Sequence, residues 1–293
     1  MKSQELKAFM KANKMNQKQI AQALAVSVGT VSLYLNGQYQ GDVQRLDDKV
    51  AEYLSRQDKK ILNVRYNRQF VPTLLARKGM EAMEVAHTEG ETVVIFGAAG
   101  LGKTQLLKEY VKNHSSAIFI ETDPSYTTKV LLRKIAEGCG VATQGSNNDV
   151  FEKIIEKLEG SERLLVIDEA ELLSTRSLEF VRRLQDKTQI GVVLAGMPRL
   201  LVNLSGKNGE LAQLHSRVTN RLDLGNALPE KDLALLTQTA LGTDEFNAAF
   251  IRFSKGNARR LSNLIKGVVR LAEINECNIT YEMIEEYSKV LMG

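Results

Sequence analysis

Eight residues about a third of the way along the chain have the types and spacing of a phosphate-binding loop. They read GAAGLGKT and match the pattern G-x-x-x-x-G-K-[ST] at every fixed position. The loop follows the apolar run VVIF at 93–96 and precedes an amphipathic stretch, the order of a strand, a loop and a helix. Glycines let backbone N–H groups surround phosphates at a helix N-terminus. The predicted phosphate-binding residues are Gly97, Ala98, Ala99, Gly100, Leu101, Gly102, Lys103 and Thr104.

A pair of acidic residues about 65 positions downstream supplies the second half of a hydrolytic site. The segment LLVIDEAE at 164–171 is an apolar run that ends in Asp168 and Glu169. We expect Asp168 and Thr104 to hold Mg²⁺, Lys103 to contact the β- and γ-phosphates, and Glu169 to polarise the attacking water. The alternative is a helix N-cap followed by an acid in the first turn. Together with the upstream loop, the pair favours ATP hydrolysis with Mg²⁺.

The composition of the chain limits its class. With 293 residues, 43% hydrophobic and 25% charged, it has room for about two domains. We find no run of the ~20 apolar residues that a membrane span needs, and the N-terminus lacks the apolar stretch of a secretory signal. Cys139 and Cys277 are too few for a disulfide framework and lack metal-ligand spacing. We expect a cytoplasmic protein without membrane contacts.

The positive charge is concentrated near the N-terminus. Residues 1–78 hold 14 Lys and Arg against 6 Asp and Glu, whereas the remaining residues hold 25 against 29. An excess of +8 in the first segment favours a polyanionic partner, although a solvated face is an alternative.

The hydrophobic patterning changes along the chain. Residues 1–55 show the spacing of short helices, and 56–72 form a basic stretch interpreted as a linker. Within 73–228 the apolar runs 93–96, 117–120, 164–167 and 190–196 alternate with amphipathic segments, which predicts a mostly parallel sheet covered on both faces. Within 229–293 the pattern is helical, with candidate helices at 230–241, 244–254, 258–274 and 280–291.

The segment NQKQIAQALAVSVGTVSLYLNG at 16–37 resembles the helix-turn-helix of phage repressors. Asn16 and Ser27 are placed to cap its two helices, and Ala25 occupies the tight turn where glycine is usual. The residues expected to face a DNA groove lack the Arg, Asn or Gln side chains of strong base readout, so we expect weak sequence preference. A helical bundle for protein contacts is the alternative. The candidate contacts are Ser27, Val28, Gly29, Thr30 and Ser32.

Two arginine-containing segments refine the class of ATPase. HSRVTNRLDL at 215–224 precedes a short strand-like run, and Arg217 in it resembles the arginine finger that AAA+ subunits insert into a neighbour's site. Arg221 is the second candidate for that role, and a surface ion pair is the alternative for both. GNARRLSNLI at 256–265 resembles the sensor 2 motif, with Arg259 as the γ-phosphate contact and Arg260 as a solvated neighbour. Met197 departs from the polar sensor 1 residue expected after the fourth strand.

In this order, the motifs resemble the AAA+ ATPases of DNA transposition, the family of the Mu B type. The fold expected is α/β: an AAA+ P-loop domain with a parallel sheet and a C-terminal helical lid, preceded by a small all-α helix-turn-helix domain. The resemblance implies a target-DNA activator that forms ATP-dependent helical filaments on double-stranded DNA and recruits a DDE transposase. The segment TDPSYTTKVLLRK at 122–134 resembles one with which related ATPases track DNA; a plain N-cap and amphipathic helix is the alternative. Its candidate DNA contacts are Tyr126, Thr127, Lys129 and Arg133.

Two other functions fit part of the pattern. A helicase or initiator loader of the IstB and DnaC type would use the same ATPase core to remodel a replicative helicase. An ATP-gated transcriptional regulator would use the helix-turn-helix to read an operator. The regulator requires sequence-specific binding, which the small side chains of the segment 27–32 do not favour.

Overall fold

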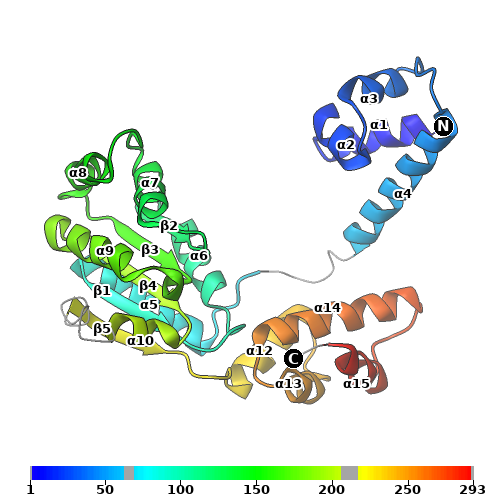
Figure 1. Cartoon of the computed structure of the whole chain (residues 1–293). Coiled ribbons are helices and arrows are strands. Elements are labelled where there is room, and N and C mark those ends of the chain that lie inside the picture. The colour runs from blue at the N-terminus through cyan, green and yellow to red at the C-terminus, as the bar shows by residue number, and fades with distance from the viewer. Residues whose placement is uncertain (1, 63–68, 206–216, 292–293) are drawn as a thin grey trace. The chain divides into compact units, whose positions relative to one another are not determined.

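The computed structural model describes residues 2–62, 69–205 and 217–291, with the backbone alone described at 56–62 and at Ser205. The chain divides into two compact units, Met1–Asn67 and Arg68–Gly293 (Figure 1).

The N-terminal unit is a small helical domain with its own hydrophobic core. Its helices are α1 (Lys2–Ala12), α2 (Gln17–Leu24), α3 (Val28–Leu35) and α4 (Val43–Leu62). Apolar residues at helical spacing bring one face of each helix into the core. The buried side chains are Leu6, Ile20, Ala21, Leu24, Val31, Tyr34, Leu46, Val50 and Tyr53.

Side-chain caps mark the starts of α2 and α3. Asn16 accepts a hydrogen bond from the backbone N–H of Gln19, and Ser27 accepts one from that of Thr30, so both predicted caps are confirmed. Ala25 ends α2 in the left-handed conformation with φ 51°, where glycine would be free of strain.

Helix α4 extends into the basic stretch that was expected to be a linker with some ordered pieces. It continues to Leu62, so the first part of the segment 56–72 is helical. The reason is physical: no glycine or proline interrupts the chain between Val43 and Leu62, and the apolar spacing of the helix persists.

The second unit contains a five-stranded sheet in which every pair is parallel. The strand order is β2-β3-β4-β1-β5. The predicted parallel sheet is confirmed, and β5 lies within the segment 215–224 instead of following it. The strands are β1 (Thr92–Phe96), β2 (Ala117–Glu121), β3 (Leu164–Asp168), β4 (Gly191–Gly196) and β5 (Val218–Asp223).

Helices pack on both faces of this sheet (Figure 1). Alternate strand residues such as Val94, Leu165 and Leu194 face a core shared with four helices: α7 (Thr128–Cys139), α8 (Asn147–Leu158), α9 (Thr175–Thr188) and α10 (Arg199–Ser205). The strands also contact two helices that contribute nothing to that core, α5 (Leu74–Glu89) and α6 (Lys103–Asn113). All carboxyl ends of the strands therefore meet at one edge, where loops can form a site.

Four helices follow the sheet: α12 (Glu230–Leu241), α13 (Asn247–Ser254), α14 (Ala258–Ile274) and α15 (Tyr281–Val290). They lie close to the expected ranges, except that α13 begins at 247 instead of 244. Asp232 on α12 is only 3% exposed, and its carboxylate accepts hydrogen bonds from the backbone N–H groups of Leu74 (2.9 Å) and Leu75 (3.2 Å). An acid of the helical segment thus caps α5, which ties this segment to the sheet domain.

Three further observations concern only the described part of the chain. None of its helices is long and apolar enough to cross a membrane. No three His, Cys, Asp or Glu side chains gather as a metal-binding group. Cys139 is buried and Cys277 exposed, and both are free thiols.

Candidate functional site

The phosphate-binding loop lies at the carboxyl end of β1, where two neighbouring segments hold it. The N–H of Gly97 donates to the carbonyl of Gly196 at the end of β4 (3.3 Å), and the N–H of Ala98 donates to that of Gly225 after β5 (2.9 Å). Gly102 precedes α6 with φ 98° and makes no side-chain cap, whereas α2, α3, α5, α7, α8, α9, α14 and α15 each have one. The first N–H groups of α6 are therefore left for phosphate oxygens.

Lys103 is folded back onto this loop. Its ammonium donates to the carbonyls of Gly97 (2.8 Å) and Ala98 (2.9 Å), and the residue is 8% exposed. Burial lowers the pKa of Lys103, while the carboxylates of Glu171, Asp168 and Glu169 act in the opposite direction. Phosphate oxygens entering the loop would replace the two carbonyls as acceptors.

Thr104 and Asp168 meet as the sequence predicts. The Thr104 hydroxyl donates to Asp168 Oδ2 at 2.6 Å, and Asp168 at the end of β3 is 1% exposed. A hydroxyl and a carboxylate are the oxygen ligands that Mg²⁺ prefers, and here they are brought together at the start of α6. The pair fits the predicted cation.

Glu169 lies at the tip of β3 in a strained conformation. Its φ is 54°, a region that non-glycine residues seldom adopt. The N–H of Glu169 donates to Asp168 Oδ1 (3.0 Å), and its carbonyl accepts from the Thr122 hydroxyl at the end of β2 (2.8 Å). Burial, and then the carboxylates of Glu171 and Asp168, raise the pKa of Glu169. These contacts fix the backbone that presents the predicted base.

The N-terminus of α14 docks on the phosphate-binding loop. Asn257 donates from Nδ2 to the carbonyl of Ala99 (2.9 Å) and caps α14 by accepting from the N–H of Arg260 (3.0 Å). The N–H of Arg259 donates to the carbonyl of Gly100 (3.1 Å). Gly100 has φ 79°, and a Cβ there would lie 2.4 Å from Asn257 Oδ1, so the contact requires glycine.

The two arginines of this segment have different surroundings. The Arg259 side chain is exposed, and its charge is close enough to contribute to lowering the pKa of Lys103. Arg260 was expected to be solvated, and that expectation is wrong. Its guanidinium donates to the carbonyls of Phe253 (2.8 Å), Leu291 (3.0 Å) and Ser288 (3.1 Å), because it fills the space between α13 and α15.

Comparison with known proteins gives a family and named relatives. Residues 87–204 match a family model described as an AAA domain. A Mu-like prophage FluMu DNA transposition protein B from Haemophilus influenzae is 27% identical over 82% of this chain and 86% of its own length. An ATP-dependent target DNA activator B from Escherichia phage Mu is 29% identical over 76% of this chain and 77% of its own.

Solved structures show the same fold. The Aeropyrum pernix ORC2 protein superposes with a TM-score of 0.60 at 17% identity, over 77% of this chain and 71% of that one. A RuvB mutant from Thermotoga maritima gives a TM-score of 0.53 at 18% identity, over 79% of this chain and 73% of that one. The chain is an AAA+ ATPase. This AAA+ ATPase is homologous to the B transposition proteins of Mu-like phages.

In the AAA+ ATPase, Arg217 lies at the opposite end of the sheet from the P-loop. It immediately precedes β5, and Val218 is in register with Thr92 at the start of β1, whereas the P-loop follows Phe96. At about 3.3 Å per residue, this separates Arg217 from the P-loop by roughly 20 Å along the strand. Arg217 is 58% exposed and lies remote from the P-loop of its own chain.

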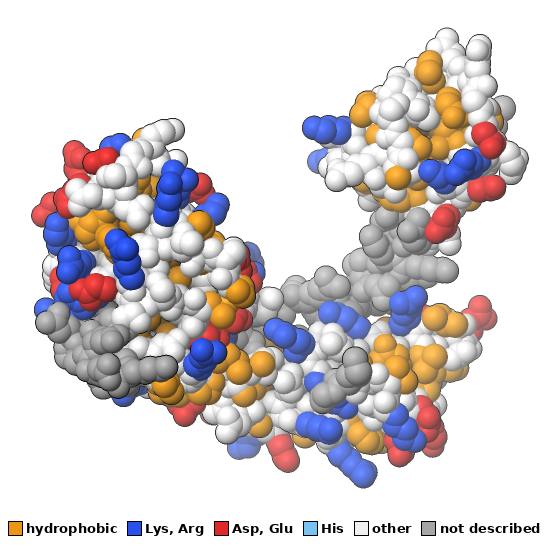
Figure 2. All heavy atoms as spheres, viewed as in Figure 1, with side chains coloured by type: hydrophobic (Ala, Val, Ile, Leu, Met, Phe, Trp, Pro, Cys, Tyr) orange, Lys and Arg blue, Asp and Glu red, His pale blue; other side chains and the backbone are white. Residues whose placement is uncertain are grey.

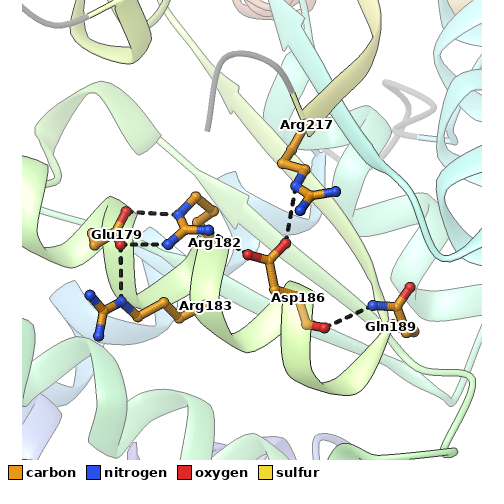
Figure 3. Close-up of polar contacts among 6 residues, drawn as sticks. All are labelled: Glu179, Arg182, Arg183, Asp186, Gln189 and Arg217. Atoms are coloured by element: carbon orange, nitrogen blue, oxygen red, sulfur yellow. Dashed lines mark hydrogen bonds and ion pairs between the residues drawn. The ribbon is translucent and has the colours of Figure 1, made fainter. Parts of the chain in front are cut away.

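A network of ion pairs holds Arg217 in place (Figure 3). Its Nε lies 3.2 Å from Asp186 Oδ1, and the other oxygen of Asp186 pairs with Arg182. Arg182, 12% exposed, is also bonded through Nε and Nη2 to Glu179, which in turn accepts from Arg183. Hydrogen bonds from Arg182 and Arg183 lower the pKa of Glu179 to about 2. The surface ion pair considered as an alternative is thus present, and it involves Nε of Arg217 (Figure 3).

The second finger candidate is placed differently. Arg221 is an exposed residue in the middle of β5, in register with Val94. It lies along the strand instead of at its end, and the choice between Arg217 and Arg221 as the finger stays a prediction. Ser216, quoted with Arg217 in the sequence motif, lies outside the described residues.

The four candidate DNA contacts after β2 divide into two kinds. Thr127 caps α7 by accepting from the N–H of Val130, and Tyr126 packs against the core of the sheet domain. The cap at Thr127 matches the alternative given above, a plain N-cap followed by an amphipathic helix. Contact of either residue with DNA stays a prediction. Lys129 and Arg133 are exposed and one helical turn apart on α7. They remain the predicted contacts with a polyanion.

The candidate contacts in the N-terminal unit divide similarly. The hydroxyls of Ser27 and Thr30 lie 2.9 Å apart at the start of α3, where Ser27 serves as the cap. The exposed surface of α3 carries the apolar side chains of Val28 and Leu33, and Figure 2 shows hydrophobic side chains on the surface of this unit. Such a surface offers little hydrogen-bonding readout of bases. DNA contact by Ser27, Val28, Gly29, Thr30 and Ser32 remains a prediction.

The structure adds three site residues that the sequence prediction missed. Glu171 follows Asp168 in the quoted DEAE segment and approaches Lys103, but its role depends on a contact with the end of β4. Asn257 has a detectable signal, because Asn before a predicted helix is a typical N-cap. No sequence pattern predicts the role of Asp186, because its partner Arg217 is 31 positions away in the sequence.

Proposed function

We propose that this AAA+ ATPase is an ATP-dependent, DNA-bound activator of the target site for a DDE transposase. The observation that carries the proposal is the extent of its similarity to B proteins. Relatives named as DNA transposition protein B and ATP-dependent target DNA activator B align with about three quarters or more of the chain. Their names speak of ATP, target DNA and transposition, and the same activity is inferred for this chain.

The hydrolytic step is assigned to residues that surround the P-loop. The N–H groups at the start of α6 and Lys103 bind the β- and γ-phosphates, and Arg259 contacts the γ-phosphate from α14. Thr104 and Asp168 hold Mg²⁺, which supplies charge neutralisation of the phosphates. Glu169 orients the attacking water and accepts its proton. Burial and neighbouring carboxylates raise the pKa of Glu169, which suits a general base.

The remaining charge on the γ-phosphate is met by a second subunit. Arg217 lies too far from its own P-loop to contact it, so in the proposed assembly it enters the site of a neighbour. Each site is then complete only between adjacent subunits, and hydrolysis requires assembly. The assembly inferred is a helical filament on double-stranded DNA.

DNA binding is assigned to many weak contacts. Lys129 and Arg133 on α7, with the basic N-terminal unit, supply a few phosphate contacts per subunit. Repetition along a filament multiplies them, which gives tight and salt-sensitive binding with little dependence on sequence.

Electron microscopy on duplexes of unrelated sequence tests this function. Filaments are expected with ATP on every duplex and not with ADP. Glu169→Gln should keep ATP binding and trap filaments, because only the chemical step is removed. Isolated dimers at one palindromic sequence would overturn the proposal in favour of a transcriptional regulator. Binding to a replicative helicase with no effect on a transposase would favour a loader.

A further inference from the structure

The end of β4 lacks the polar side chain that the AAA+ resemblance leads us to expect there. The strand ends at Gly196, and the next residue, Met197, offers only a thioether. A carboxylate from another element reaches this position. Glu171 lies in the 3₁₀ turn Ala170–Leu172 that follows β3 and Glu169.

Two contacts anchor Glu171 to the segment after β4. Its Oε1 accepts a hydrogen bond from the backbone N–H of Met197 at 2.9 Å. Its backbone carbonyl accepts one from Nδ2 of Asn203, on α10, at 2.8 Å. The side chain is therefore held in one orientation between the carboxyl ends of β3 and β4.

The second carboxylate oxygen is the unusual one. Oε2 of Glu171 is buried and has no hydrogen-bond partner among the described residues. A buried carboxylate oxygen without a donor is unfavourable by more than an ordinary lost hydrogen bond, so a donor is expected there, and a water molecule that enters with the nucleotide can supply it. Gly196 makes the room for this oxygen, because a Cβ there would lie 2.0 Å from Oε2.

The surroundings of Glu171 point to the hydrolytic step. Of the carboxylates near Lys103, Glu171 has the largest electrostatic effect on the lysine, ahead of Asp168 and Glu169. Glu171 is also the charged group with the largest effect on Glu169, and the two carboxyl groups are close enough for a hydrogen bond between them to raise the pKa of Glu169 further. The Glu171 carboxylate therefore lies close to both the phosphate-binding lysine and the predicted base.

We propose that Glu171 positions the attacking water by accepting a hydrogen bond from it at Oε2. A water molecule has two protons, and the site offers two carboxylates. Glu169 takes the proton that is lost, while Glu171 orients the other. The oxygen of the water bonds to the γ-phosphorus, the bond from that phosphorus to the bridging oxygen breaks, and ADP leaves with that oxygen.

The variant Glu171→Gln separates this role from a structural one. Because the N–H of Met197 needs an acceptor, the amide oxygen takes the place of Oε1 and the NH₂ group takes the place of Oε2. The anchor survives, but a donor replaces the acceptor that faces the water. We expect kcat to fall about 10- to 100-fold with the KM for ATP and the melting temperature unchanged.

A second variant moves the carboxylate without removing it. Gly196→Ala places a methyl group against Oε2, the flexible end of the Glu171 side chain, and should reduce kcat to a similar degree. Glu152→Gln is the matched control. It neutralises an exposed acid on α8 that pairs with Lys187 at 3.3 Å, and it should leave kcat unchanged.

Binding of phosphate analogues gives a readout besides activity. ADP with aluminium fluoride and Mg²⁺ mimics the phosphoryl group in transfer together with its attacking water, whereas ADP with beryllium fluoride mimics bound ATP. Glu171→Gln should weaken the aluminium fluoride complex about as much as it lowers kcat, and leave the beryllium fluoride complex unchanged. Wild-type turnover in both Glu171→Gln and Gly196→Ala would overturn the proposal. So would an equal loss of both complexes in both variants, which indicates a structural role. Turnover and analogue binding are measured with and without DNA, so that a loss caused by Glu171→Gln is distinguished from a failure of the subunits to assemble.

Discussion

Arg217 Nε lies 3.2 Å from Oδ1 of Asp186, at the end of the sheet remote from the P-loop of the same subunit. The carboxylate pairs with Nε, the guanidinium nitrogen nearest the chain, and none of the six residues drawn bonds to the two terminal nitrogens (Figure 3). A bidentate phosphate contact needs those two nitrogens. The ion pair therefore orients Arg217 without blocking the contact proposed for it.

Removing Asp186, which orients Arg217, should lower the rate of ATP hydrolysis less than removing Arg217 itself. Arg217→Ala is expected to lose DNA-stimulated hydrolysis and keep ATP binding. Asp186→Asn should lower kcat only about 3- to 10-fold, because an exposed pair contributes modestly and the arginine is still present. Steady-state turnover and fluorescent ATP binding measure both effects. Arg183→Gln, which alters the same network without touching Asp186, is the control and should match wild type. Full activity in Arg217→Ala would transfer the finger role to another residue.

Mixed assemblies should show that Arg217 acts between subunits. Subunits with Arg217→Ala keep a complete P-loop site, and subunits with Glu169→Gln keep the arginine. Each variant alone should be nearly inactive, yet a mixture should hydrolyse ATP faster than the sum of the two, because some sites combine an intact Glu169 with an intact Arg217. A mixture no more active than its components, in filaments shown to contain both, would mean that Arg217 acts within its own subunit.

The sequence was informative where a motif is local. GAAGLGKT, the pair Asp168–Glu169 and the caps at Asn16 and Ser27 involve neighbouring residues, and the structure has them as expected. The parallel sheet followed from buried apolar runs, because strands covered on both faces have few polar positions.

Features that depend on distant contacts were not predictable in the same way. Arg260 belongs to a basic, polar-looking stretch, but the position of α15 surrounds it with carbonyl acceptors. The pairing of Arg217 with Asp186 joins the residue before β5 to α9, 31 positions away in the sequence. Thr127 and Tyr126 were expected to contact DNA because their segment resembles one that tracks DNA in related ATPases; in the structure Thr127 caps α7 and Tyr126 packs against the core, and their contact with DNA stays a prediction.

The contact between α14 and the P-loop should couple nucleotide binding to the helical segment. Asn257→Ala removes both the cap of α14 and the bond to Ala99. We expect a loss of about 1 kcal/mol in the free energy of unfolding from the cap. Weaker ATP binding should accompany it, because Arg259 loses its fixed position. Urea unfolding and ATP titration measure the two. Asn263→Ala, on the same helix, is the control; equal effects in both variants would contradict the coupling.

The pairing of Glu179 predicts a pH dependence of stability. Hydrogen bonds from Arg182 and Arg183 lower its pKa from 4.5 to about 2 in the folded chain. Stability from this group is therefore fully present above pH 4.5 and is lost as the pH falls toward 2. Glu179→Gln should lower the free energy of unfolding at pH 7 by about 1 kcal/mol, a figure reduced for solvent screening, and by less at pH 3. Urea unfolding at both pH values checks this. A difference that is constant with pH would show that the ion pairs contribute nothing.

The opposite placement of Arg217 and the P-loop on one sheet gives any row of subunits a direction. A contact that joins one end of the sheet to the other end of the next is heterologous, so it forms a ring if the rotation between subunits closes and an open row if it does not; the proposed filament is the open case. One terminal subunit then holds a nucleotide that no arginine reaches, while the other terminal subunit has an arginine that meets no nucleotide. Under the proposed function, the terminal subunit whose nucleotide no Arg217 reaches keeps its ATP longest. Subunits should thus be lost preferentially from the other end, where the terminal Arg217 meets no nucleotide. Single-filament imaging would show this polarity as faster shortening at that end.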